Sequence, residues 1–74
     1  MAERDITIIN DTLGTIYVRV SKTGSDTQDF VEIKLKQHHV WKRTAVESAV
    51  IVKSGEKSTV EWFVEPGKDY TFPV

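Results

Sequence analysis

The sequence predicts an all-β fold, a small antiparallel Greek-key β-sandwich of about six or seven short strands. Apolar and polar residues alternate at period two along most of the chain, which is typical of strands with one buried face. Turn residues recur at short spacing between these runs. The same observations leave one alternative open, a small barrel of about five or six strands.

Four alternating runs predict half-buried strands. Their inward positions are Ile6 and Ile8, then Ile16, Val18 and Val20, then Val31, Ile33 and Leu35, and finally Val60, Trp62 and Val64. Residues 49–52 are apolar on both faces, which predicts a central strand or one whose outer face meets another subunit. Residues 44–50 are the one stretch with some helical character, but they are short and rich in valine. Residues 70–72 predict the final strand, which Pro73 ends because it has no N–H for the ladder.

Turn residues separate these strands. The predicted turns cover residues 10–14, 22–26, 53–57 and 65–68. Pro66-Gly67 suits a type II turn, because proline presets φ at the first central position and glycine supplies the positive φ that follows. Asn10-Asp11-Thr12 matches the N-glycosylation pattern, but we interpret it as turn chemistry.

Length and composition limit the function classes. With 74 residues and no cysteine, the chain predicts a single β domain over residues 1–74, which relies on packing or on a second copy for stability. A homo-oligomer is therefore expected. The first residues contain no apolar run after a basic region, which favours a cytoplasmic location. The net charge of −1 argues against nucleic acid as a partner.

The segment 34–43, with the sequence KLKQHHVWKR, is the strongest candidate for a binding surface. It contains four basic residues, no acidic ones, both histidines and one of the two tryptophans. On a strand Trp41 points to the same side as His39 and Arg43, which would form a flat apolar plate edged by hydrogen-bond donors. Sugars and bases stack on such plates. The alternative is that Trp41 covers the open end of the core, with Arg43 lying over it as a cation–π cap.

Other side chains extend the candidate surfaces. The candidate ligand-binding residues are Trp41, Arg43, His39, Tyr17 and Lys42. Phe63 is predicted to point outward between two glutamates, so Phe63, Val50 and Val52 are candidate interface residues. Lys34 and Lys36 share one strand face, which is typical of either a charged protective edge or an anion site joined to Lys42 and Arg43.

Catalysis and metal binding have little support in the sequence. Nucleophilic chemistry needs an activated Ser or Cys with a base and an orienting acid, and no motif of that kind is present. The adjacent His38 and His39 point to opposite faces of a strand and do not converge on a metal. Residues 23–29 offer oxygen atoms for calcium but lack the order of an EF-hand loop. We therefore expect no catalytic residue, no metal and no cofactor.

Several short motifs bear a resemblance to a known group of proteins. They are Ile6-Thr7-Ile8-Ile9-Asn10 with Thr12, then Ile16-Tyr17-Val18-Arg19-Val20-Ser21-Lys22, then Trp41, Arg43 and Glu47, and finally Pro66, Thr71 and Phe72. In these motifs the chain resembles small cysteine-free fungal β-sandwich proteins. The resemblance implies a cytoplasmic protein of a largely uncharacterised group, in which some members are lectins or membrane-active defence proteins. Ala45-Val46 departs from the pattern, because an aromatic residue often precedes the glutamate there.

Three functions remain open from the sequence. The first is a non-enzymatic binding module for carbohydrate, lectin-like and oligomeric, so that weak sites gain avidity. The second is a membrane or anionic-ligand binder that uses the basic segment, with affinity that falls steeply with salt. The third is a self-assembling structural protein without a small ligand. The exposure of Trp41 is the observation that best separates the first from the others.

Overall fold

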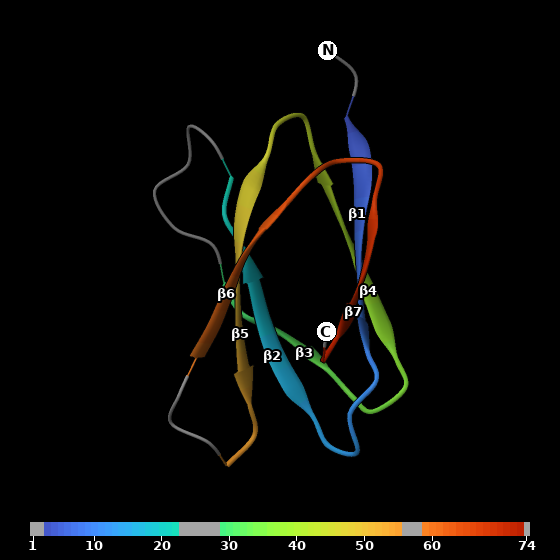
Figure 1. The fold of residues 1–74 in the computed structure, drawn as a ribbon, viewed down its shortest axis with the longest axis vertical. Helices are drawn as coiled ribbons and strands as arrows, with labels where there is room; N and C mark the ends of the chain where they lie inside the picture. The colour runs from blue at the N-terminus through green and yellow to red at the C-terminus, as the bar shows by residue number, and fades with distance from the viewer. Residues whose placement is uncertain (1–2, 23–28, 56–58, 74) are drawn as a thin grey trace.

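The computed structural model describes residues 3–22, 29–55 and 59–73, which form seven β-strands (Figure 1). In chain order they are β1 (Arg4–Asn10), β2 (Ile16–Val20), β3 (Val31–Ile33), β4 (His38–Arg43), β5 (Glu47–Lys53), β6 (Thr59–Val64) and β7 (Asp69–Phe72). The all-β prediction is confirmed, and residues 44–50 contain no helix. The predicted turn at 22–26 and the calcium-type oxygens at 23–29 fall largely outside the described residues, as does the end of the turn at 53–57.

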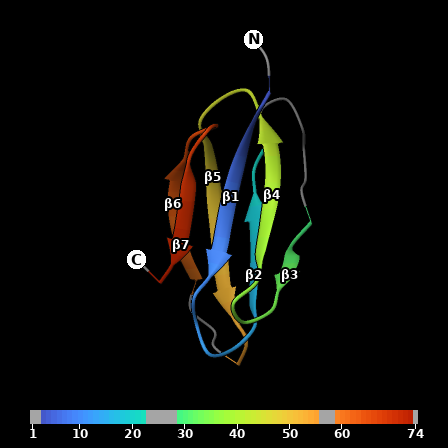
Figure 2. The same ribbon diagram turned by 90° about the vertical axis from the view of Figure 1, so that its right-hand side faces the viewer.

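Two sheets pack face to face as a β-sandwich (Figure 1, Figure 2). One has the strand order β4-β1-β7 and the other β3-β2-β5-β6. The links β1–β2, β3–β4, β4–β5 and β6–β7 cross between the sheets, as Greek-key connections do. β1 and β7 run parallel, which differs from the purely antiparallel prediction. Parallel neighbours require a long crossover, and here all the strands from β2 to β6 supply it.

The core lies between the sheets and follows the predicted alternation in most strands, but Val60, predicted to point inward, is 39% exposed on the edge strand β6. Ile6 and Ile8 of β1 are fully buried, while Thr7 and Ile9 between them are partly exposed. The same pattern holds in β2 and β5, and β5 is a central strand as predicted. Trp62 and Tyr70 are half-buried and pack against the rim of this core. Among the described residues no helix is long and apolar enough to cross a membrane.

The prediction that Leu35 continues the strand of Val31 and Ile33 is wrong. β3 ends at Ile33, and Leu35 lies in a turn with 49% of its surface exposed. Lys36 has a φ of 62°, in the left-handed region that interrupts a strand. The turn is closed by a hydrogen bond from the Gln37 N–H to the Lys34 carbonyl (3.0 Å). The alternation in the sequence therefore extends further than the strand.

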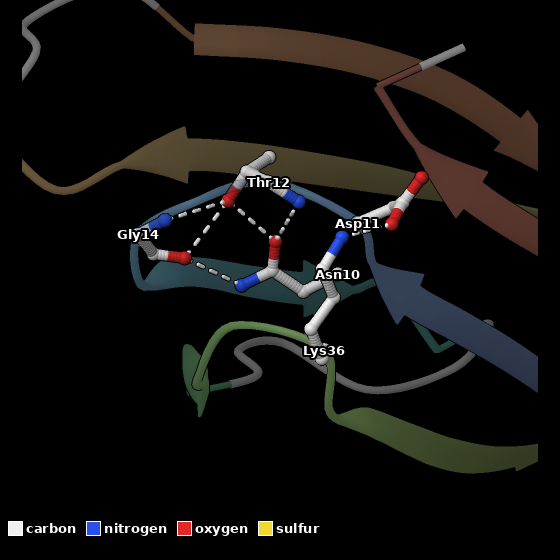
Figure 3. Close-up of polar contacts among 5 residues, drawn as sticks. All are labelled: Asn10, Asp11, Thr12, Gly14 and Lys36. Atoms are coloured by element: carbon white, nitrogen blue, oxygen red, sulfur yellow. Dashed lines mark hydrogen bonds and ion pairs between the residues drawn. The ribbon is translucent and has the colours of Figure 1, made fainter.

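Asn10 is fully buried and joins three segments of the chain (Figure 3). Its amide donates to the carbonyls of Gly14 and Ile33, both at 2.8 Å. Its side-chain oxygen accepts from the Thr12 N–H (2.9 Å) and the Thr12 hydroxyl (2.6 Å). Its backbone carbonyl accepts from the Lys36 N–H (2.8 Å). The interpretation of residues 10–12 as turn chemistry is consistent with these bonds, and Asn10 also ties this turn to the end of β3.

The turn between β6 and β7 contains Pro66 and Gly67, as predicted. Gly67 has a φ of 87°, the conformation expected at the second central position of a type II turn. Its N–H donates to the Asp5 carbonyl (2.8 Å), which ties the turn to β1. The turn therefore needs a residue that adopts a positive φ at this position, which glycine does without strain.

Replacing Gly67 with alanine is expected to lower the free energy of unfolding by about 1 kcal/mol, because its φ strains any residue with a Cβ. The added Cβ would meet the Arg4 Cδ at 3.4 Å, a side chain that can move aside, so backbone strain dominates. Gly14→Ala is the matched control: its Cβ would meet nothing within 4 Å, and no positive φ opposes it. Urea unfolding of both variants measures the difference, and equal losses would contradict the strain explanation.

Candidate functional site

Trp41 is a core residue. Only 8% of its surface is exposed, and it stands opposite the fully buried Ile6 in the β1–β4 register. The His39 ring, itself exposed, packs edge-on against it with the ring centroids 4.7 Å apart. Of the two interpretations of Trp41, the structure supports the core one, but the described residues show no cation–π contact between Arg43 and this ring, on which His39 packs instead. A buried ring offers no open face for stacking, so segment 34–43 does not present the exposed aromatic surface that was predicted for ligand binding.

Arg43 is also buried, with 8% of its surface exposed. Its guanidinium donates to three backbone carbonyls, those of Val20 (3.1 Å), Ser21 (3.0 Å) and Lys42 (2.8 Å). The bonds to Val20 and Ser21 give the carbonyls at the end of β2 hydrogen-bond donors and join β4 of one sheet to β2 of the other. The guanidinium is thus engaged with the backbone and holds the fold together.

The remaining basic side chains of the segment lie beside carboxylates or in solvent. Lys36 Nζ lies 2.6 Å from Asp11 Oδ1, and Lys42 Nζ lies 3.8 Å from Asp5 Oδ1. Both pairs are well exposed, so each contributes little to stability. Each pair does offset a positive charge locally, which weakens this surface as an anion site.

Tyr17, Val50 and Val52 lie together on the outer face of the four-stranded sheet. Tyr17 and Val52 are direct neighbours in the β2–β5 register, and with Phe30 they line a shallow apolar hollow of about 320 Å³. Phe30 is 44% exposed. Tyr17 is therefore not brought together with Trp41 or Arg43, which belong to the interior.

Phe63 points outward as predicted, with 81% of its surface exposed. It lines an open groove of about 620 Å³ beside the edge strands β6 and β7. These two strands lie at the left of Figure 2. The groove is lined by residues of β6, of β7 and of the following segment, namely Trp62, Phe63, Asp69, Tyr70, Thr71 and Pro73. Its size lies within the range usual for small-ligand pockets.

The groove combines aromatic rings with oxygen-bearing side chains. The Trp62 ring packs against the buried Phe72, with the ring centroids 5.6 Å apart, and this contact holds the Trp62 ring in place. The Tyr70 hydroxyl accepts a hydrogen bond from the Glu65 N–H (2.8 Å), which holds that ring in place. Asp69 and Thr71 are exposed and supply a carboxylate and a hydroxyl. Rigid rings beside a few polar groups are the usual composition of a small-molecule site.

The charge of the groove comes from Asp69 of β7 and from the neighbouring turn residues Glu65 and Lys68. Lys68 Nζ lies 3.0 Å from Glu65 Oε2, and the hydrogen bond and charge of this carboxylate raise the pKa of Lys68 above its usual value. The positive charge of Lys68 is therefore offset by the carboxylate of Glu65. Asp69, which lines the groove, then gives the groove an acidic rather than a basic character.

The sequence pointed to only one residue of this groove, Phe63. Trp62 was predicted as an inward residue because it shares a face with Val60 and Val64, and it is indeed half-buried at the rim. Tyr70 and Asp69 carry no distinguishing pattern in a short terminal strand. The groove exists because β6 and β7 are edge strands of different sheets, and alternation within one strand does not reveal that.

The residues behind the resemblance to fungal β-sandwich proteins lie mainly in structural positions. Asn10 and Arg43 bind backbone groups, and Glu47 is buried, where it accepts a hydrogen bond from the Ser21 hydroxyl (3.0 Å). Within the described residues, no group of three or more His, Cys, Asp or Glu side chains is placed to hold a metal ion. No protein-family model, no curated protein and no solved structure matches this chain.

Proposed function

We propose that the protein is a non-enzymatic carbohydrate-binding module and that the β6–β7 groove is its binding site. The single observation behind this proposal is the open groove of about 620 Å³, in which Trp62, Phe63 and Tyr70 stand beside Asp69 and Thr71. A sugar ring has an apolar C–H face and a rim of hydroxyls. Aromatic rings match the first, and a carboxylate and a hydroxyl match the second.

The charge around the groove favours a neutral ligand. Asp69 lines the groove, and the nearby Lys68 is held by Glu65 at 3.0 Å. A phosphate or an anionic lipid headgroup would meet a carboxylate there, which is unfavourable. A neutral sugar donates hydroxyl hydrogens to that same carboxylate, and hydrogen bonds to an ionised acceptor are the stronger kind. This supports a carbohydrate over the anionic ligand suggested by the basic segment.

The exposure of Phe63 supports a role in binding. A phenylalanine with 81% of its surface in water contributes little to the core, so its position is better explained by contact with a partner. It stands next to Trp62 in the sequence, and both line the same groove. A saccharide can therefore contact an exposed ring and a half-buried ring together.

Replacing Phe63 with alanine is expected to weaken glycan binding about tenfold or more, because one stacking contact is lost. Its exposure means that the variant should unfold at the same urea concentration as the wild type. A glycan array identifies the bound sugar, and titration of that sugar followed by tryptophan fluorescence, which includes the signal of Trp62 in the groove, measures the affinity.

Asp69→Asn is the matched variant at the polar side of the groove. It removes the charge at nearly constant shape and should weaken the same sugar about tenfold through the lost charge-assisted hydrogen bond. Lys42→Ala, on the basic segment, should leave the affinity unchanged. A wild-type protein that binds no glycan on the array would rule out the proposed function. Binding that depends on Lys42 and not on Phe63 would place the site on the basic segment.

A further inference from the structure

The outer face of the four-stranded sheet carries an apolar stripe beside the β6–β7 groove, and Phe63, which lines the groove, lies on the same face opposite Ser48 in the β5–β6 register. Val50 and Val52 of the central strand β5 are half-buried and face outward, and Tyr17 lies beside Val52. Phe30 borders the stripe and is 44% exposed. These side chains belong to a face that no other element of the described structure covers.

A row of opposite charges crosses this stripe. In the strand register Arg19 of β2 stands opposite Val50, and Val50 stands opposite Glu61 of β6. A positive side chain on β2, an apolar one on β5 and a negative one on β6 therefore lie side by side across three adjacent strands. Both charged residues are exposed. The Arg19 guanidinium lies 5.1 Å from the Phe30 ring centroid, and it forms no ion pair with the part of the chain that the structure describes.

We propose that this face binds a second copy of the same chain in a two-fold symmetric dimer. Two sheets pack face to face about 10 Å apart with their strands nearly aligned. A two-fold axis in the interface and parallel to β5 places Val50 against Val50 and Val52 against Val52. The same operation places β2 of one copy over β6 of the other. Arg19 then faces Glu61 of the second copy, and the contact occurs twice.

Charge complementarity identifies the partner as a second copy. A face with both signs on opposite sides of an apolar stripe is complementary to itself under this rotation, whereas a purely apolar face would accept many partners. Glu61 already accepts a hydrogen bond from the Ser48 hydroxyl (2.9 Å), so its carboxylate is held on the outer face.

The expected dimer is weak. Four strands about 4.8 Å apart and about five residues long present on the order of 300–400 Å² of flat area per copy. Standard protein interfaces bury about 800 Å² per partner, so we expect a dissociation constant on the order of 100 µM. Trp62, Tyr70 and Asp69 of the groove lie outside this face, whereas Phe63 lies on it, opposite Ser48 in the β5–β6 register, so the dimer borders the Phe63 side of the groove.

Charge reversal provides a specific test. Arg19→Glu and Glu61→Arg each place like charges opposite each other at both contacts, and each variant alone should dimerise at least about tenfold more weakly than the wild type. An equimolar mixture of the two variants restores opposite charges at both contacts of a heterodimer. The mixture should therefore associate within about threefold of the wild type at low salt.

Sedimentation velocity over about 10 µM to 1 mM measures all four samples. Val52→Asp, at the centre of the stripe, should also abolish the dimer, and circular dichroism confirms that each variant is folded. A wild type that remains monomeric at the highest concentration would overturn the proposal. So would a mixture that stays monomeric, or single variants that dimerise as well as the wild type. The array, run well below the expected dissociation constant, measures glycan binding on the monomer, so failure of one proposal can be told from failure of the other.

Discussion

Replacing Asn10 with alanine is expected to lower the free energy of unfolding by about 3 kcal/mol. The side chain is fully buried and makes four hydrogen bonds, two as donor and two as acceptor. Alanine leaves the Ile33 carbonyl without its donor at a buried position, and an unsatisfied buried group costs more than the average bond contributes. Urea unfolding followed by circular dichroism measures the change.

Two neighbouring variants serve as controls for Asn10. Asp11→Asn breaks the exposed ion pair with Lys36 and should change stability by less than about 1 kcal/mol. Asn10→Asp keeps the size and the acceptor but directs a carboxylate at the carbonyls of Gly14 and Ile33. It should be destabilised at neutral pH and regain part of the loss on acidification, because the protonated acid can donate. A loss below about 1 kcal/mol for Asn10→Ala would contradict the structural role.

Replacing Trp41 with alanine is expected to lower the free energy of unfolding by about 3–5 kcal/mol, the usual cost of deleting a large buried aromatic side chain. Trp41 packs opposite Ile6 and contacts the His39 ring, so its removal leaves a cavity at the β1–β4 edge of the core. A chain of 74 residues has a total stability of about 4–11 kcal/mol. The variant is therefore expected to lose a large share of its stability, which urea titration followed by circular dichroism measures.

Trp41→Phe separates packing from recognition. Phenylalanine keeps most of the apolar volume and should cost about 1–2 kcal/mol, so this variant stays folded. Its glycan affinity should equal that of the wild type, since the buried ring does not line the groove. Loss of binding in the folded Trp41→Phe variant would contradict the location proposed for the site.

The strand faces were predictable from the sequence. Ile6, Ile8, Ile16, Val18 and Val20 are fully buried as their alternation indicated, and the doubly apolar 49–52 run lies in a central strand. Alternation depends only on the local geometry of a strand, in which successive side chains point to opposite faces. The same rule failed at Leu35, where the left-handed Lys36 ends the extended chain.

The roles of the polar residues were less accessible. Asn10 was predicted as a turn residue, but its bond to the Ile33 carbonyl spans 23 residues of sequence. Strand alternation places Arg43 on the same face as Trp41, where the sequence predicted an exposed hydrogen-bond donor. In the structure Arg43 is buried, because its guanidinium donates to the carbonyls at the end of β2. Such contacts depend on where distant segments meet, which no local pattern contains.

Local patterns were enough to predict an all-β chain, the inward face of most strands, the left-handed glycine turn at 66–67 and the outward position of Phe63. The position of Trp41 in the core and of Trp62 and Tyr70 along an open groove depends instead on how distant segments pack. Period-two alternation assigns a side chain only to a face of its own strand. Whether that face is covered depends on which strands pair and which remain at an edge, and those pairings are set by packing between residues far apart in the chain.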